Sequence, residues 1–181
     1  MKKTKKCSES FVTMTELVLP NDTNGLDNLM GGRLMHWMDI AAAIAAQKHS
    51  NRIVVTASVD NISFTEPVRK SNAVTITAFV TRAFTSSMEV YLEVIAEDIP
   101  SDRKVHSNKA FFTFVAVDQT GQPINIPEVV PETDLEKELY AGALRRRQLR
   151  LVLGGRMKPD EATELKSIFT LNTAEDGANG T

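Results

Sequence analysis

The residues Gly31-Gly32-Arg33-Leu34-Met35-His36-Trp37-Met38-Asp39, followed by an alanine-rich run over 40–46, give the strongest structural signal in this chain. Two glycines open a stretch that is helical in character and apolar on nearly every face. A helix of this kind packs inside a domain rather than on its surface. We therefore expect a central, buried helix over about 31–48, with a single carboxylate, that of Asp39, in its middle.

Predicted strands lie on both sides of this helix, one before it over 11–19 and four after it over 53–64, 73–84, 88–96 and 106–117. The later strands are joined mostly by tight turns, which favours antiparallel pairing. The last of them has apolar residues on both faces, which is typical of a strand inside a covered sheet. One long helix and about five strands predict an α+β fold with an antiparallel sheet wrapped around the helix.

The two ends of the chain differ from this central part. Residues 1–10 are basic and polar without the apolar core of a signal peptide, so we expect a flexible, solvated tail. The folded domain should span 11–130. Thr133-Asp134-Leu135-Glu136 can cap a C-terminal helix within 131–153. The remainder, 154–181, should be a partly disordered tail with a short helix near 159–169.

The composition is that of a globular protein, with 181 residues, of which 42% are hydrophobic and 24% charged. A formal net charge of −2 gives no general argument for nucleic acid, and no run approaches the ~18 apolar residues of a membrane span. Cys7 is the only cysteine, which rules out an internal disulfide and fits a reducing compartment. We expect a cytoplasmic protein with no nucleic-acid partner.

Asp39 is the first candidate for chemistry. Burying a carboxylate costs several kcal/mol unless it is paired or hydrogen-bonded. The neighbours one helical turn away are Met35, Met38, Ala42 and Ala43, and they offer no polar partner. Asp39 therefore either points to a wet edge or a subunit boundary, or acts as a general base whose partners come from elsewhere in the fold.

Donor groups precede the acid along the chain. Gly31 and Gly32 would let a ligand approach backbone N–H groups at the helix start, where the helix dipole favours negative charge. Asn24 and Asn28, in the preceding loop, add side-chain amides. Each has a plain structural alternative, because diglycines form tight turns and loop asparagines form turns. Thr56 could orient a water or the acid, or could be an ordinary strand residue.

The spacing of these groups predicts an oligomer. Asp39 lies eight residues after Gly31, roughly 12 Å along the axis at about 1.5 Å per residue. At this separation, the N–H groups at the helix start and the carboxylate of Asp39 in the same chain should not both contact one carbonyl group of a substrate. If both act on one substrate, two chains must contribute, so we expect a two-fold dimer with shared sites.

No metal site is predicted. His36, His49 and His106 lie far apart in the sequence, and one cysteine adds no ligand cluster. The arginines at 145–147 usually form a solvated helix face, although they could hold phosphates.

Several short motifs between residues 11 and 150 are specific when taken together: Asn21-Asp22-Thr23-Asn24, Gly31-Gly32-Arg33-Leu34-Met35 with Met38-Asp39, Val54-Val55-Thr56-Ala57-Ser58-Val59-Asp60, Phe64-Thr65-Glu66-Pro67-Val68, Thr85-Ser86-Ser87-Met88, Ala110-Phe111-Phe112-Thr113-Phe114-Val115-Ala116-Val117-Asp118 and Val129-Val130-Pro131-Glu132-Thr133. With them the chain resembles the acyl-coenzyme A thioesterases of the hotdog superfamily, in the group of the YciA-type and cytosolic acyl-CoA hydrolases. Met30 and Ser71-Asn72 depart from this pattern, since the family often has Phe or His, and Gly-Asp, at these places.

The resemblance implies a single hotdog domain, dimers with shared active sites and commonly trimers of dimers, that is, hexamers. It implies hydrolysis of fatty acyl-CoA to free fatty acid and CoA, with no cofactor beyond the CoA of the substrate and product. The position of Asp39 is that of the general base or nucleophile. The position of Asn24 binds the thioester or the water from the partner chain, and that of Thr56 assists.

We expect Asp39 of one chain to activate a water, while Asn24 and the N–H groups near Gly32 of the other chain hold the thioester oxygen. Direct attack by Asp39, which gives an anhydride, stays open as an alternative. Four residues are candidates for the CoA phosphates on grounds of charge: Arg82, Ser86, Ser87 and Lys109. A non-catalytic acyl-CoA sensor or scaffold is the alternative function, and a histidine-dependent hotdog dehydratase is the alternative enzyme, with His36 as the only nearby histidine.

Overall fold

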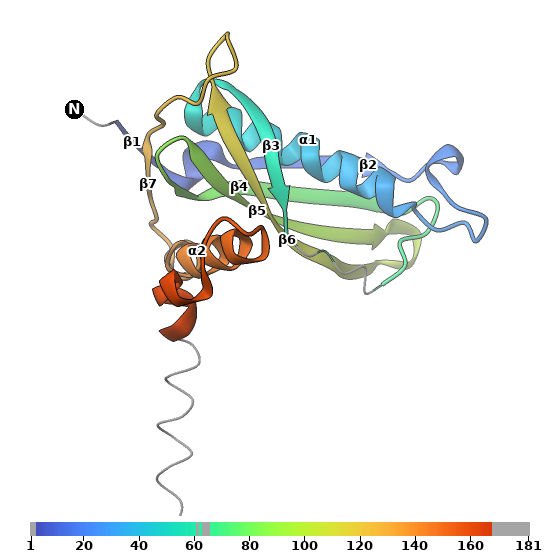
Figure 1. Ribbon diagram of the computed structural model, residues 1–181. Coiled ribbons are helices and arrows are strands. Elements are labelled where there is room, and N and C mark those ends of the chain that lie inside the picture. Colours follow the sequence, from blue (N-terminus) through green and yellow to red (C-terminus); the bar gives the residue numbers. More distant parts are fainter. Residues whose placement is uncertain (1–2, 61, 63–65, 168–181) are drawn as a thin grey trace, which may run out of the picture. The chain divides into compact units, whose positions relative to one another are not determined.

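The computed structural model describes residues 3–60, 62 and 66–167, and of 105–107 it describes the backbone only (Figure 1). The chain forms two compact units, Met1–Glu132 and Thr133–Thr181. Parts of the predicted strand over 53–64 and of the Phe64–Val68 motif lie outside the described residues, as does the side chain of His106.

The central helix of the first unit is α1, Gly31–Ser50. It begins where the carbonyl of Met30 accepts hydrogen bonds from the N–H groups of Arg33 and Leu34. It ends at Asn51, whose left-handed backbone (φ 53°) is one that asparagine adopts with little strain. The prediction of a helix over 31–48 is confirmed.

A curled antiparallel sheet packs along this helix, with its five strands in the order β2-β4-β5-β6-β3 (Figure 1). The strands are β2 (Val12–Leu17), β3 (Ile53–Val59), β4 (Ala73–Ala83), β5 (Ser87–Asp98) and β6 (Arg103–Val117). Strand β6 lies between β5 and β3, as its two apolar faces predicted. The predicted α+β fold with one helix and an antiparallel sheet is confirmed.

The core lies between α1 and one face of the sheet. Side chains alternate between the two faces of a strand, so every second residue of β4, β5 and β6 faces the helix. Ile76, Met88 and Phe112 are fully buried representatives of these three strands. Each such side chain contributes about 1.5–3 kcal/mol when it leaves water. The alanines of α1, Ala41, Ala42, Ala45 and Ala46, are also fully buried, and their small side chains let the sheet approach closely.

The helix expected to be buried is buried on one side only in the single chain. Ile40 and Ile44 are 37% and 42% exposed, because the sheet covers only one side of the helix. The edge strand β3 is likewise open, and its Val55 is 48% exposed. An apolar helix face and an apolar sheet edge are therefore accessible in one chain.

The expectation of a flexible tail over 1–10 is wrong for residues 4–10. Strand β1 (Thr4–Lys6) pairs in parallel with β7 (Glu128–Val130). A turn of 3₁₀ helix over Cys7–Ser10 follows, and the hydroxyl of Ser10 accepts the N–H of Val80 at 2.9 Å. This order depends on partners far along the chain, which the local composition does not reveal.

The second unit contains α2, Asp134–Leu153, with the predicted cap. Thr133 Oγ1 accepts the N–H of Glu136, and the Glu136 carboxylate accepts the N–H of Thr133. A 3₁₀ turn over Pro159–Glu161 and helical residues 163–167 follow, within the range where a short helix was expected. The rest of the predicted tail lies outside the described residues. In the described ranges, no helix has an apolar stretch sufficient to cross a lipid bilayer.

Candidate active site

Asp39 and Thr56 meet in the structure. Asp39 lies in the third turn of α1, and Thr56 lies on the neighbouring edge strand β3. The hydroxyl of Thr56 donates a hydrogen bond to Oδ1 of Asp39 over 2.8 Å. Hydrogen bonds to an ionised acceptor are stronger than neutral ones, so this contact holds the carboxylate in one orientation. Asp39 is half-buried and Thr56 is exposed at the open edge of the sheet.

A β-bulge follows Thr56 on its strand. The pairing of β3 with β6 shifts between Thr56 and Ser58, which leaves Ala57 as the extra residue. Thr56 pairs with Phe114, a buried residue, and paired residues of an antiparallel sheet share a face. Thr56 therefore faces α1, and the bulge ends that regular alternation directly beyond it. Bulges are common beside active sites because they set the direction of a side chain.

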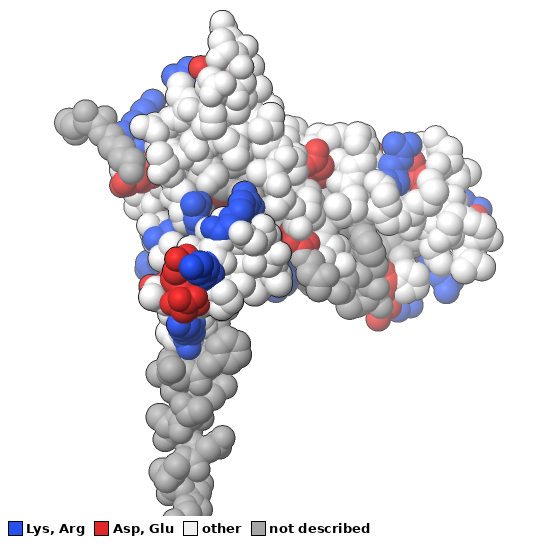
Figure 2. Space-filling model, viewed as in Figure 1, with Lys and Arg blue, Asp and Glu red and all other residues white. Residues whose placement is uncertain are grey.

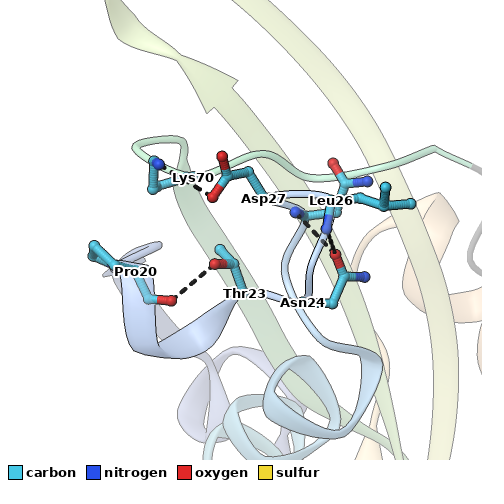
Figure 3. A network of polar contacts seen from close by, with 7 residues as sticks. Pro20, Thr23, Asn24, Leu26, Asp27 and Lys70 are labelled. Atoms are coloured by element: carbon cyan, nitrogen blue, oxygen red, sulfur yellow. Dashed lines mark hydrogen bonds and ion pairs between the residues drawn. The ribbon is translucent and has the colours of Figure 1, made fainter.

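Asn24 lies on an exposed loop before α1, with its side-chain oxygen already engaged (Figure 3). Asn24 Oδ1 accepts the N–H of Leu26 at 2.9 Å and that of Asn28 at 3.3 Å. Its backbone N–H donates to the carbonyl of Asn28 at 2.8 Å. Asn24 Oδ1 is therefore already used by hydrogen bonds within the loop, and the NH₂ group of the side chain remains as a donor toward a ligand.

The loop that carries Asn24 is bound to the segment before β4. Asp27 pairs with Lys70 at 3.1 Å, and the carbonyl of Asp27 accepts the N–H of Lys70 (Figure 3). The N–H of Leu29 donates to the carbonyl of Val68 at 2.7 Å. An exposed ion pair contributes little, so the backbone hydrogen bonds account for most of the order of this loop.

Asp22 was missed by the sequence reasoning. Its side chain accepts the Nε–H of Arg33 over 2.6 Å and the backbone N–H of Leu19 over 3.0 Å. Its carbonyl accepts the N–H of Met30. Asp22 is only 4% exposed, so it joins the start of the loop to the first turn of α1. The sequence signal for this contact was a pair of opposite charges, Asp22 shortly before Asn24 and Arg33 in the first turn of the helix.

Gly32 is exposed at the start of α1, and a Cβ built on it would meet nothing within 4 Å. Its backbone N–H has no acceptor among the described residues, as expected in the first turn of a helix. Packing within this chain therefore does not require a glycine here. The space beside this N–H is open to a ligand or to another chain.

The candidate site residues thus lie in two separate places along α1. Asn24 and Gly32 lie at the N-terminal end of α1, where Asp22 joins the loop to the helix. Asp39 and Thr56 lie further along, near the middle of the helix. No contact joins Asp39 to Asn24 in the described part of the chain. The axial separation that predicted a shared site is present in the structure.

The predicted CoA residues divide into two places. Arg82, Ser86 and Ser87 surround the turn between β4 and β5, and Ser87 is in register with Val115 of β6. Lys109 instead pairs with Glu93, which lies six positions after Ser87 on β5. At 3.3 Å per residue, this places Lys109 about 20 Å from the turn. The structure therefore does not bring Lys109 together with the other three.

The two histidine side chains that the structure describes, those of His36 and His49, do not lie together. His49 is fully buried, with Nε2 at 2.9 Å from the carbonyl of Pro127, and burial lowers the pKa of its imidazole. His36 is exposed on α1. No group of three metal-ligating side chains is present within the described ranges.

Residues 26–101 match the thioesterase superfamily. The chain is 41% identical over 143 residues to YkhA of Bacillus subtilis, an uncharacterized acyl-CoA thioester hydrolase, covering 79% of this chain and 83% of that protein. It is 35% identical over 157 residues to the cytosolic acyl coenzyme A thioester hydrolase of Rattus norvegicus, covering 84% of this chain and 41% of the rat protein. The chain thus spans less than half of the rat relative.

Solved structures share the fold. One is an apo-hexameric acyl-CoA thioesterase, with a TM-score of 0.80 and 37% identity over 82% of this chain and 95% of that one. Another is the acyl-CoA hydrolase from Staphylococcus aureus in complex with butyryl coenzyme A, coenzyme A and coenzyme A disulfide, with a TM-score of 0.77 and 34% identity over 95% and 99% of the two chains.

The same Staphylococcus aureus hydrolase has also been solved as three variants, in which an aspartate, a threonine or an asparagine is changed to alanine. That threonine follows the aspartate by seventeen positions, and that asparagine precedes it by fifteen. Thr56 and Asn24 have the same spacings from Asp39 in this chain. The chain belongs to the thioesterase superfamily, in the group of acyl-CoA thioester hydrolases that have the hotdog fold.

Proposed function

We propose that this protein hydrolyses the thioester of fatty acyl-CoA to free fatty acid and CoA. The observation that carries the proposal is the hydrogen bond from Thr56 to Asp39, which holds a carboxylate at the open face of the central helix. The names of the relatives from Bacillus subtilis and Rattus norvegicus support the substrate class. We also infer that the protein works in the cytoplasm, as the name of the rat relative supports, and that it needs no cofactor beyond the substrate's own CoA.

Asp39 acts as the general base. Thr56 occupies Oδ1, so Oδ2 is the oxygen that takes a proton from a water. The water oxygen bonds to the thioester carbon, and the negative charge moves to the carbonyl oxygen. When this intermediate collapses, the carbon–sulfur bond breaks and CoA leaves as a thiolate. The thiolate takes up the proton that Asp39 removed from the water, so Asp39 is again a carboxylate at the end of the turnover.

The charge on the carbonyl oxygen is held by donors of a second chain. The NH₂ group of Asn24 and the backbone N–H of Gly32 are donors at the helix start for which no acceptor is present among the described residues. Such fixed donors stabilise the oxyanion because they need no reorientation when the charge forms. The spacing match with the three Staphylococcus aureus variants supports these roles for Asp39, Thr56 and Asn24.

A two-fold dimer completes the site. Exposed apolar side chains lie on one side of α1 and on β3, one of the two edge strands of the sheet, and they include Ile40, Ile44, Ile53, Val55 and Val59. An unpaired edge strand with apolar side chains is a template for pairing with another chain. Two helices that run in opposite senses then place Asp39 of each chain near the helix start of the other. The hexameric relative supports further assembly into a trimer of such dimers.

The experiment measures thiol release from short, medium and long acyl-CoA esters by the wild type and by Asp39→Asn. We expect turnover to fall by about 10²–10⁴ in the variant, the usual contribution of a positioned base. Asp160→Asn, at an exposed carboxylate of the second unit, is the matched control and keeps the wild-type rate. A wild type that binds acyl-CoA without releasing thiol would support the sensor alternative instead.

Single turnover in ¹⁸O-labelled water separates the two chemical routes. A general base places the label in the released fatty acid. The anhydride route places it in the Asp39 carboxylate when water attacks the aspartyl carbon.

A further inference from the structure

A second open site lies at the far end of α1, opposite to the helix start. It is a cleft of about 590 Å³ within the first unit. Three parts of the chain form its walls: the N-terminal segment, the end of α1 and the segment before β7. The residues that line it are Lys3, Lys5, Ser50, Asn51, Arg52, Asn125, Ile126 and Pro127.

The charged residues that line this cleft are all cations, namely Lys3, Lys5 and Arg52. Lys5 is fixed in the wall, because its Nζ donates to the carbonyl of Lys48 at 2.7 Å and to Oδ1 of Asn51 at 2.9 Å. Burial, and to a smaller extent the charge of Lys3, lowers the pKa of Lys5, while Glu9 opposes this change. The Glu9 carboxylate accepts the backbone N–H of Lys6 and is not part of the lining.

Neutral donors complete the lining. The oxygen of the Asn51 side chain is used by Lys5, so its NH₂ group remains available. The side chain of Asn125 and the guanidinium of Arg52 have no hydrogen bond or ion pair among the described residues. Two of the last four carbonyls of α1 are occupied, since Lys48 accepts from Lys5 and Gln47 accepts from the N–H of Asn51. Figure 2 shows basic side chains gathered on the side of this unit that carries β1.

We propose that this cleft binds a phosphate-bearing anion, with Arg52, Lys3 and Lys5 as its charged ligands and the amides of Asn51 and Asn125 as neutral donors. A guanidinium presents a planar fork of N–H groups that matches phosphate oxygens, and an ammonium adds a point charge. Three cations without a lining acid match a chain of phosphates better than a single carboxylate. The apolar wall of Ile126 and Pro127 leaves room for an organic group attached to the phosphates.

Two sources have this chemistry, the nucleotide end of the CoA substrate and a separate phosphate metabolite. The first rests on the proposed function and fits the topology. The N–H of Ile126 donates to the carbonyl of Thr85, which places the cleft wall beside the turn that contains Ser86. Arg52 directly precedes β3 and lies four residues before Thr56, about 13 Å at 3.3 Å per residue, so the cleft lies at the start of the strand that carries Thr56.

The test measures binding of tripolyphosphate to the full chain by calorimetry at low salt. We expect saturable binding to the wild type and affinity at least about tenfold weaker for Arg52→Gln and for Lys3→Gln, since each removes a charge-assisted hydrogen bond. Lys104→Gln removes one positive charge outside the cleft and serves as the matched control, with affinity within about twofold of the wild type. No saturable binding, or equal weakening in all three variants, would overturn the proposal.

Competition distinguishes the two sources. CoA displaces tripolyphosphate if the nucleotide end of the substrate occupies the cleft. A nucleoside triphosphate displaces it while CoA does not if the ligand is a separate metabolite. Pantetheine carries no phosphate, and displacement by pantetheine would contradict a phosphate site. The binding assay needs no turnover, so an inactive protein would end the proposed hydrolysis and leave this result intact.

Discussion

Arg33 and Asp22 connect the first turn of α1 to the loop that carries Asn24. The guanidinium Nε–H donates to Asp22 Oδ1 over 2.6 Å, and the other carboxylate oxygen accepts the N–H of Leu19. Asn24 is two residues beyond Asp22, and Gly32 is one residue before Arg33. The pair therefore sets the distance between the two proposed oxyanion donors.

Replacement of Asp22 should affect both stability and turnover. In Asp22→Asn, Arg33 loses a charged partner, and we expect the free energy of unfolding to fall by about 1–3 kcal/mol. Because the Asn24 loop then moves relative to the helix start, kcat should fall while KM changes little. Denaturant unfolding and steady-state thiol release measure the two effects. Asp134→Asn, an exposed first-turn acid of α2, is the control, and an equal loss of kcat there would contradict a positioning role.

The Thr56 hydroxyl should matter to the rate more than the shape of its side chain. Thr56→Val keeps the volume and removes the donor to Asp39, so we expect turnover to fall by about tenfold to a hundredfold. Thr56→Ser keeps the hydroxyl and should retain most of the rate. The kcat of each variant is measured with the same acyl-CoA ester and compared with that of the wild type. Equal rates in the two variants would show that the hydrogen bond does not contribute.

The edge of β3 should control assembly. Val55→Lys places a charge on the open strand, and we expect it to shift the protein to monomers and to reduce activity together with assembly. Leu17→Lys introduces the same change on β2, the opposite edge of the sheet, and should leave the dimer intact. Light scattering after size-exclusion chromatography measures the mass. An active Val55→Lys monomer would be incompatible with a shared site.

The pH dependence of stability should report His49. Burial lowers its pKa below the ordinary value of 6.5, so the unfolded chain binds this proton at a higher pH than the folded chain does. The neutral imidazole therefore stabilises the fold above pH 6.5, and that contribution is lost as the pH falls through 6.5 toward the lower pKa of the folded state. Unfolding by urea between pH 8 and pH 5 should show a steeper loss for the wild type than for His49→Gln. Parallel curves would exclude His49 as the cause.

Local patterns were sufficient for the central helix, the strands of the main sheet and the C-terminal helix. The helix over 31–50, the strands around it and the cap at Thr133 follow from periodicity and from short-range hydrogen-bonding chemistry, which neighbouring residues carry. Asp39 was identifiable for the same reason, because a carboxylate among apolar helix residues is unusual wherever the helix packs. The separation of Asp39 from the helix start followed from helix geometry alone.

The contacts between distant segments could not be read in this way. The hydrogen bond from Thr56 to Asp39 depends on the register of β3 against β6 and on the bulge at Ala57. The order of Thr4–Lys6 depends on pairing with a segment more than 120 residues later, and the basic cleft combines residues from three separate parts of the chain. Sequence patterns determine which residues can form an element and which carry charge. Only the packing of the sheet on α1 brings particular side chains within hydrogen-bonding distance, because register and loop closure are properties of the whole fold.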